Sequence, residues 1–508
     1  MSELEAAFIR HNKKIWRNFT PVKGNGEVLV ESYDIAAGII AFGYFANVLA
    51  KKHKAEIKVY AERPTGLQSR IYRWNTDKKY KSFNAVPFYV ELSKSQLLEV
   101  ESLFDKVYPT LNTKRDVEDL KVEGLWIGDL LYDSYVMRYR VPTVEIQDER
   151  FHSSLRKALG YYIYWRDYFD SHNVKSVIVS HCVYSRNATI LRIAVQRGIP
   201  AYQVTAFLLY RLTPERLWAF NDFLFYPEWF KSLSPQEQQM GLKLAKEKIG
   251  RRLAGKFDVD LGYCSKSAFI RNNNNQRVIR ESSRIKILIA THCFFDAPHP
   301  YGVHLFPDLY EWLTFLGKIS ERTDYDWYIK THPDFLPGNT EALESIICNY
   351  PKITLIPNDT SHLQIVEEGI DFVLTVYGTV GFEYAALGVT VINASLSNPH
   401  IGYNFNIHPK TVEEYESILL NLKNQKLDIN INEVYEYYYM KYLYDKGGSW
   451  LVDDFINRIG GVAKQRDPIS YKLFLNDFTI QRHEKTLKSL VNFIESGDFC
   501  FRKKHYGR

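Results

Sequence analysis

The sequence lacks an apolar stretch long enough to cross a bilayer. Its longest predominantly apolar run, residues 35–50, spans 16 positions, whereas a membrane-spanning helix needs about 20. The N-terminal residues also lack the apolar segment of a secretory signal. We therefore expect a cytoplasmic protein and interpret residues 35–50 as a buried helix.

Cysteine is scarce, and no two cysteines are close in sequence. The odd count of five excludes a simple disulfide framework, and the spacing is unlike that of a Cys-rich zinc site. A reducing compartment fits this usage best. The cysteines are Cys182, Cys264, Cys293, Cys348 and Cys500.

An excess of charge of either sign is absent as well. Lys plus Arg is 65 and Asp plus Glu is 59, so the net charge of +6 is too dilute for a dedicated nucleic-acid binder. Hydrophobic residues make up 45% and charged residues 24%, which argues against disorder. Aromatic residues reach 15%. That share suits a cleft that stacks on rings or sugars, and a well-filled core explains it equally well.

Strands and helices alternate in both halves of the chain. Residues 27–61 and 174–205 each predict a strand–helix–strand unit, and residues 285–394 predict five strands with intervening helices. This pattern predicts two Rossmann-like doubly wound α/β domains with a helical tail. The expected boundaries are an N-terminal acceptor domain at 1–264, a linker at 265–284, a donor domain at 285–425 and helices at 426–508 that pack back across both domains.

A glycine-rich turn follows the predicted strand at 371–377. Gly378 and Gly381 would let the backbone approach an anion, and the Thr379 hydroxyl adds a donor at a helix N-terminus. Glu383 lies in the first helical turn, where a carboxylate can accept hydrogen bonds from a ribose diol. The alternative is a plain strand-to-helix turn, but the combined pattern favours a nucleotide site.

Two earlier strand ends supply further candidates. His332 follows the predicted strand 325–332, so it points from the sheet edge where open α/β folds bind ligands. Lys330 is able to balance phosphate charge, although one lysine near a strand end is usually a surface residue. Thr291 begins the first loop of the C-terminal domain and borders the same edge.

These residues carry a resemblance. Segment 371–393 resembles the nucleotide-binding element of GT-B glycosyltransferases and of the related sugar-nucleotide 2-epimerases. Residues 330–333, Lys-Thr-His-Pro, are similar to an element of bacterial capsule-type transferases, including polysialyl-, Kdo- and polyol-phosphate transferases. The resemblance implies that Glu383 binds the ribose, that residues 378–381 face the donor phosphates and that His332 lies at the phosphate or nucleotide. It covers about residues 285–395, and the N-terminal half matches in topology alone.

The base that would deprotonate the acceptor hydroxyl is not decided by the sequence. An inverting transfer needs a carboxylate or a histidine for this step. Asp34, in the first strand-to-helix loop, His181, after strand 174–181, and Asp133 are the candidates in the N-terminal half. Asp34 serves equally well as a helix cap. His332 is a catalytic candidate on the donor side.

No metal or other cofactor is expected. Asp258 and Asp260 have the spacing of a metal motif, but they precede the linker instead of following a strand, so we interpret them as coincidence. The spacing of Asp296, His299 and His304 suits no common metal site.

The sequence thus predicts a metal-independent GT-B glycosyltransferase. It would move a sugar from a nucleotide sugar to a bacterial surface glycan of capsule or lipopolysaccharide type, with a glycan or lipid-linked glycan as acceptor and no nucleic-acid partner. The alternatives are a polyol-phosphate transferase, a sugar-nucleotide 2-epimerase or a non-catalytic glycan-binding scaffold. The basic tail at 502–508 adds an expectation of peripheral contact with the inner membrane.

Overall fold

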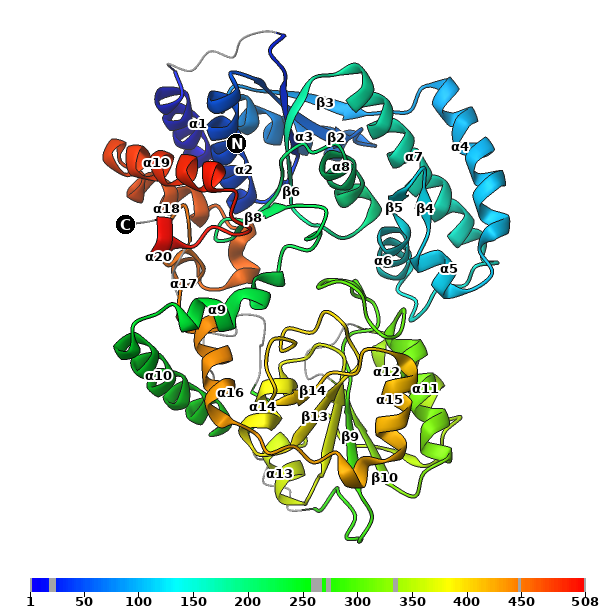
Figure 1. The fold of residues 1–508 in the computed structure, drawn as a ribbon. Helices are drawn as coiled ribbons and strands as arrows, with labels where there is room; N and C mark the ends of the chain where they lie inside the picture. Colours follow the sequence, from blue (N-terminus) through cyan, green and yellow to red (C-terminus); the bar gives the residue numbers. More distant parts are fainter. Residues whose placement is uncertain are drawn as a thin grey trace. The chain divides into compact units, whose positions relative to one another are not determined.

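The computed structural model describes residues 2–17, 24–256, 267–270, 276–331, 337–445 and 449–506. The chain divides into two compact units. The first unit comprises Met1–Ser134, Ile146–Ala219 and Asp445–Arg508, and the second comprises Tyr135–Glu145 and Phe220–Tyr444. Figure 1 shows one α/β sheet in each of them.

The first unit is built on a six-stranded sheet of order β3-β2-β1-β6-β7-β8. All neighbouring strands are parallel except the edge strand β8, which runs antiparallel to β7. The chain leaves β1 toward one edge and returns at β6 toward the other, so the predicted doubly wound topology is confirmed. The strands are β1 Glu27–Glu31, β2 Glu56–Glu62, β3 Ala85–Val90, β6 Val174–Val179, β7 Ala201–Val204 and β8 Leu209–Leu212.

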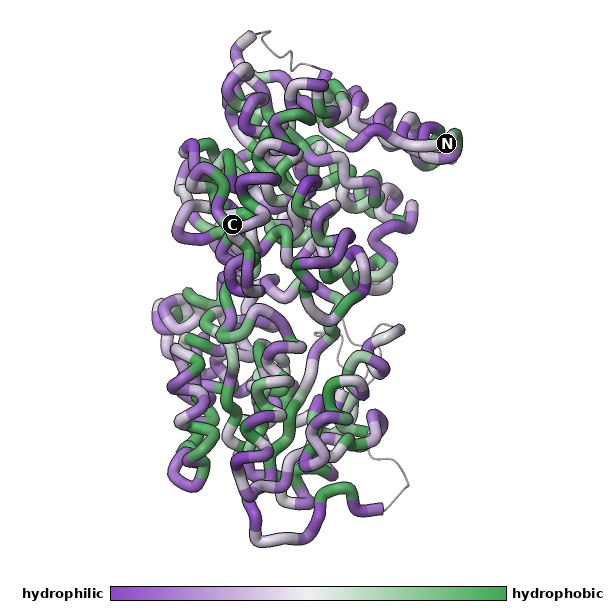
Figure 2. The backbone as a smooth tube through the Cα atoms, turned by 90° about the vertical axis from the view of Figure 1, so that its right-hand side faces the viewer, coloured by the Kyte–Doolittle hydropathy of each residue, from purple (hydrophilic) through white to green (hydrophobic). Residues whose placement is uncertain are grey.

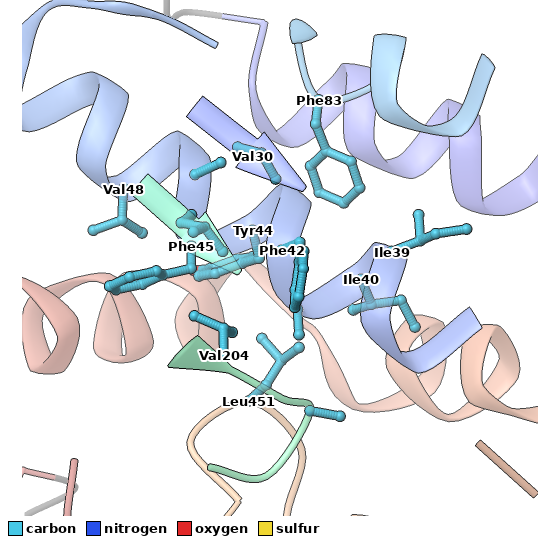
Figure 3. Packing of buried hydrophobic residues seen from close by; sticks show 14 of the residues in the cluster. Val30, Ile39, Ile40, Phe42, Tyr44, Phe45, Val48, Phe83, Val204 and Leu451 are labelled. Carbon is cyan, nitrogen blue, oxygen red and sulfur yellow. The ribbon is translucent and has the colours of Figure 1, made fainter. Parts of the chain in front are cut away.

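Helices cover this sheet, and α2 is the most deeply buried of those in the core. Every residue of α2 from Ala36 to Ala50 is buried, which confirms the buried helix predicted for the longest apolar run. Figure 3 shows Phe42, Tyr44 and Phe45 of this helix packed among strand residues and the C-terminal segment. The helices of this part of the unit are α1 Glu3–Ile15, α2 Ala36–His53, α3 Leu67–Lys81, α4 Lys94–Val107, α5 Lys114–Glu118, α7 Glu149–Ser171 and α8 Ser185–Gln196.

The last part of the chain completes the first unit. Helices α17 (Phe455–Ile459), α18 (Ile469–Asp477), α19 (Ile480–Ser496) and α20 (Lys503–Tyr506) belong to it, and α18 and α19 lie against α1 and α2 (Figure 1). The Arg211 N–H donates to the Phe499 carbonyl at 2.7 Å, beside the β8 edge. The segment predicted at 426–508 is divided between the units: residues up to Tyr444 belong to the second, whereas the apolar side chains after 445 join the core of the first.

The second unit repeats the same topology with an all-parallel sheet of order β11-β10-β9-β12-β13-β14. Five strands were predicted, and the short edge strand β14 adds a sixth. The strands are β9 Lys286–Ala290, β10 Asp326–Lys330, β11 Ile353–Leu355, β12 Phe372–Thr375, β13 Thr390–Asn393 and β14 Asn406–Ile407. The helices that alternate with them are α11 Leu309–Glu321, α12 Asn339–Ile347, α13 His362–Glu367, α14 Val380–Ala386 and α15 Val412–Leu420.

The boundary predicted at residue 264 lies too late in the chain. Helices α9 (Tyr226–Lys231) and α10 (Pro235–Leu253) belong to the second unit, where they pack with α16 (Ile431–Tyr438). Their shared core is largely aromatic, so this layer is held by ring packing. Its rings include Phe223, Tyr226, Phe230, Phe382, Phe405, Tyr437, Tyr438 and Tyr439. Hydrophobic and hydrophilic segments alternate along both units (Figure 2).

Residues 122–131, whose apolar composition also allows a single strand, fold differently, and the predicted linker is only partly described. Residues 122–131 form a hairpin of β4 (Lys121–Val122) and β5 (Leu125–Trp126), followed by α6 (Gly128–Tyr139). Glu123 and Gly124 both have positive φ, as a two-residue hairpin turn requires. Within the linker 265–284, the structure describes residues 267–270 and 276–284.

Candidate active site

The second unit has a topological switch point between β9 and β12, where the connections leave the sheet in opposite directions. Ligands of open α/β sheets bind at such points, beyond the carboxyl ends of the strands. The predicted residues Thr291, Gly378, Thr379 and Glu383 all follow one of these two strands. The structure therefore brings the predicted donor-side residues to one edge of the sheet. His332 lies outside the described residues.

An aromatic stack joins the loops after β9 and β12. The His292 ring lies parallel to the Tyr377 ring, with centroids 4.4 Å apart, and its Nε2 is 3.2 Å from the Thr375 hydroxyl. A Cβ added at Gly378 would lie 2.8 Å from His292 Cε1. Gly378 thus makes room for the histidine ring, a reason that the sequence pattern did not reveal.

A neighbouring histidine also explains why residue 381 is a glycine. A Cβ at this position would lie 2.4 Å from Cε1 of His400, which is buried and whose pKa burial lowers well below the ordinary value. The Gly381 N–H already donates to the Gly378 carbonyl at 3.0 Å. An anion bound at this turn would therefore contact the backbone N–H groups that precede Gly381 in the turn. The Thr379 side chain makes no capping hydrogen bond, so its hydroxyl is not committed to the helix.

Glu383 is buried in the first turn of α14 and forms an ion pair with Arg252 of α10. The Arg252 Nε donates to Oε1 at 2.7 Å, and the guanidinium makes a second bond to the same oxygen. Among the described residues, Oε2 accepts no hydrogen bond. The carboxylate is thus held by Arg252 through one oxygen only. Arg252 was not anticipated, because it lies in a helix far from the motif in sequence.

Lys330 is a buried residue, 2% exposed, at the end of β10. Burial lowers its pKa to about 8, and the nearby Asp359 carboxylate opposes this shift. Its Nζ donates to the Asn358 carbonyl at 2.7 Å. Thr291 is buried too, and its N–H donates to the Lys330 carbonyl at 3.2 Å. Its hydroxyl lies 3.3 Å from the same carbonyl, so Thr291 holds two strand ends together.

The pocket beside the His292–Tyr377 stack is small. Its cavity volume is about 30 Å³, enough for one or two water molecules. His304 and Asp296, whose sequence spacing suits no common metal site, line it. His304 instead lies 2.7 Å from the Ser395 hydroxyl and 2.6 Å from the Pro298 carbonyl. No group of three metal-ligating side chains occurs within the ranges that the structure describes, and Asp258 and Asp260 lie outside those ranges.

The first unit has its own switch point, between β1 and β6. Glu31, at the end of β1, accepts hydrogen bonds from the N–H and the hydroxyl of Ser180, both at 2.7 Å. His181 Nδ1 lies 2.8 Å from the same hydroxyl. Because Ser180 gives its proton to Glu31, its oxygen accepts from the His181 Nδ1–H. This tautomer leaves the basic lone pair of His181 on Nε2.

A polar pocket of about 500 Å³ opens near this switch point. It contains Asp34, but the Asp34 carboxylate is held at both oxygens by Arg73, at 3.1 and 3.0 Å. Asp34 does not cap α2, whose N-cap residue is Ile35. Among described residues the pocket is lined by Asp34, Glu62, Arg63, Pro64, Thr65, Gln68, Ser69, Tyr72, Arg73 and Arg186.

Asp133, the third candidate base, is fully buried within α6. A carboxylate without solvent exposure does not reach an acceptor hydroxyl unless its helix moves. Its burial thus argues against Asp133 as the base, which otherwise stays a prediction. Of the three candidates, His181 combines partial exposure with an orienting hydrogen bond.

Two Rossmann-like doubly wound units in one chain make up the GT-B type of fold. No family model matches the chain, and no curated protein matches it. Among solved structures it is similar to the β-Kdo 2,4-transferase KpsC of Thermosulfurimonas dismutans, with 12% identity and a TM-score of 0.28 over 52% of this chain and 79% of that one.

Two further solved structures are similar at the same low level. One is the UDP-GlcNAc 2-epimerase of Neisseria meningitidis bound to UDP-GlcNAc, with 9% identity and a TM-score of 0.22 over 82% of this chain and 98% of that one. The other is Anabaena HepE in complex with UDP and glucose, with 10% identity and a TM-score of 0.24 over 93% of this chain and 100% of that one.

Proposed function

We propose that this protein is a glycosyltransferase that uses a nucleotide-sugar donor and acts on a bacterial surface glycan of capsule or lipopolysaccharide type. The observation that carries the proposal is Glu383. It lies in the first helical turn after the switch-point strand β12, and its Oε2 accepts no hydrogen bond from the described residues. That is the position from which a carboxylate binds a ribose diol at the carboxyl edge of an open sheet.

The donor phosphates would lie beside the turn that precedes α14. The Thr379 hydroxyl and the first N–H groups of the turn supply donors. Lys330 is mostly cationic at neutral pH, since its pKa is about 8, and is able to balance phosphate charge. We propose that these groups and His332 stabilise the leaving nucleotide without a metal ion or other cofactor.

The acceptor would bind in the first unit, and His181 is the proposed base. Its Nε2 lone pair is directed by the Glu31–Ser180–His181 chain of hydrogen bonds. The adjoining pocket exposes Arg186, whose guanidinium donates no hydrogen bond within the described ranges. Such a group suits an acidic or phosphorylated glycan.

Cytoplasmic location with peripheral membrane contact remains part of the proposal. None of the described helices is long and apolar enough to span a membrane. The basic C-terminal tail is a weaker membrane anchor than its sequence indicates, because Lys503 pairs with Asp453 and Arg502 lies 3.9 Å from Asp498.

The decisive experiment is a thermal-shift screen with CMP, CDP, UDP, GDP and their sugars. A nucleotide at about a thousand times its Kd stabilises the folded state by about 4 kcal/mol. We expect one nucleotide to raise the melting temperature of the wild type and of His181→Gln. We expect the shift to disappear in Glu383→Gln, which keeps the shape of the side chain and its contact with Arg252 but removes the charge.

His181→Gln serves as the matched control, because its site belongs to the first unit. A shift with CMP indicates an ulosonic-acid donor, CDP a polyol phosphate, and UDP or GDP a hexose. If no nucleotide shifts the wild type, or if Glu383→Gln responds as the wild type does, the donor site proposed here is refuted. The non-catalytic scaffold then becomes the better account.

A further inference from the structure

Helix α3 presents large apolar side chains to solvent. Leu67 is 75% exposed, Ile71 53% and Trp74 57%. Their spacings of four and three residues place all three on one side of the helix. Scattered exposed apolar residues are ordinary, but a contiguous stripe of large ones marks a surface that binds something.

The opposite side of α3 is buried and mostly polar, which differs from the usual arrangement of a surface helix. Arg73 forms an ion pair with Asp34, and Lys79 forms one with Glu5. Thr76 is also buried on this side. The fully buried Tyr80 ring also anchors this side in the core, so the helix is fixed through ion pairs and one aromatic ring, and its apolar stripe takes no part in that attachment.

Basic side chains extend the same outward face. Lys78 follows Trp74 by one turn, and its Nζ lies 3.2 Å from the centroid of the Trp74 ring. Arg70 and Lys81 are exposed on this side as well. Arg70, Lys78 and Lys81 thus make the border of the stripe basic, and Asp77 is the only acidic residue between Leu67 and Lys81.

We propose that this face of α3 is a docking surface for an anionic lipid bilayer. Leucine, isoleucine and tryptophan side chains enter the boundary between headgroups and acyl chains, and the basic side chains beside them attract anionic headgroups. A purely apolar partner surface would leave these cations unpaired. The charge around the stripe therefore favours a lipid surface over a second protein.

Helix α3 also lines the polar pocket of the first unit, so docking through α3 would bring that pocket close to the membrane. Its first turns supply Gln68 and Ser69 to the polar pocket of the first unit, and Tyr72 lines the same pocket. The pocket is thus placed beside the docking surface. A substrate carried by a lipid would reach it without leaving the bilayer, a consequence that rests on the proposed function, whereas the docking itself does not.

The test is co-sedimentation of the full-length protein with lipid vesicles. We expect binding to vesicles of phosphatidylglycerol and phosphatidylcholine in equal amounts, and much weaker binding to phosphatidylcholine alone. The triple variant Leu67→Ser/Ile71→Ser/Trp74→Ser should bind at least about tenfold more weakly. Arg70→Glu/Lys81→Glu should lose the preference for the anionic vesicles.

The matched control is Leu97→Ser/Leu98→Ser on α4, which removes two leucines that are 51% and 74% exposed. It should bind as the wild type does. All substituted side chains are exposed, so the melting temperatures should agree, which shows that each variant is folded. The fluorescence of Trp74 should shift to the blue on anionic vesicles, and this component should be absent from Trp74→Phe.

Three results would overturn the proposal. The first is a wild type that binds neither kind of vesicle. The second is equal loss of binding in the α4 control. The third is a wild-type dimer that the triple variant converts to monomer in light scattering, because the stripe would then be covered by a second copy of the chain. None of these measurements uses a nucleotide, so they stand apart from the donor-site test.

Discussion

At the scale of single residues, the packing around Gly381 leaves no room for a larger side chain. The space that its side chain would fill holds the ring of His400, and Asn406 Nδ2 lies 2.9 Å from the same point. Both neighbours are buried. A larger residue at this position would therefore have to displace buried side chains, which costs more than displacing water.

We expect Gly381→Ala to destabilise the second unit by about 1–3 kcal/mol, the usual cost of overpacking a core. Gly250→Ala, in helix α10, is the control. A Cβ at Gly250 meets nothing within 4 Å, so this change should stabilise by about 0.5–1 kcal/mol through lower chain entropy in the unfolded state. Urea unfolding measures both. Equal effects from the two substitutions would contradict the packing role of Gly381.

The sequence located the donor-side residues but not their partners. Glu383, Gly378 and Thr379 form a local pattern, and local patterns can be recognised in a sequence. Arg252 lies 131 positions from Glu383. Arg73 likewise holds Asp34 across 39 positions. A single sequence contains no signal for pairs that only folding brings together, which is why Asp34 was open to interpretation as a cap or a base.

At the scale of elements, strands buried on both faces were predicted well and α3 was not predicted. Buried parallel strands are short apolar runs between turn residues, so they can be recognised in the sequence. Helix α3 departs from the usual helical pattern because most of its inward residues are polar or charged, whereas Leu67, Ile71 and Trp74 face outward. The hairpin at β4 and β5 was missed because each of its strands has only two residues.

Helix α19 gives a prediction at this scale. Phe493 is fully buried in the first-unit core, so Phe493→Ala should lower the free energy of unfolding by about 3–5 kcal/mol. Ile480 begins the same helix and is 63% exposed, so Ile480→Ala should cost little. Thermal unfolding followed by circular dichroism distinguishes them. A small effect of Phe493→Ala would mean that α19 adds little to that core.

At the scale of the whole molecule, each unit holds a half-buried histidine with a lowered pKa. Burial lowers the pKa of His408 in the second unit to about 4, and that of His483 in the first unit to about 4 as well. In the unfolded chain these rings bind a proton at about pH 6.5. Between pH 6.5 and 4 the unfolded state therefore binds more protons, and stability falls as the pH falls.

We expect the melting temperature to drop steadily between pH 6.5 and 4.5. His408 accounts for at most about 3 kcal/mol of this loss in the second unit. His408→Gln should reduce the drop, whereas His172→Gln, at an exposed position, should leave it unchanged. Calorimetry at several pH values provides the measurement. An unaltered acid response in His408→Gln would show that other groups control it.

The doubly wound topology of both units could be predicted from the alternation of strands and helices. The assignment of each segment to one unit or the other could not. Nothing local in residues 445–506 indicates that they return to the first unit. Their apolar character alone does not say which core they join, and the backbone pairing beside β8 and the contacts with α1 and α2 decide the matter.

That return has a consequence for biosynthesis. The first unit begins at the N-terminus but includes Trp450, Leu451, Phe474 and Phe493 in its core. A ribosome delivers those residues only after the whole of the second unit has been translated. The domain that starts first is therefore completed last, and until termination it exposes the apolar surface of α2 that the C-terminal helices cover. Nascent chains stalled before residue 445 should for this reason depend on chaperones that shield apolar segments.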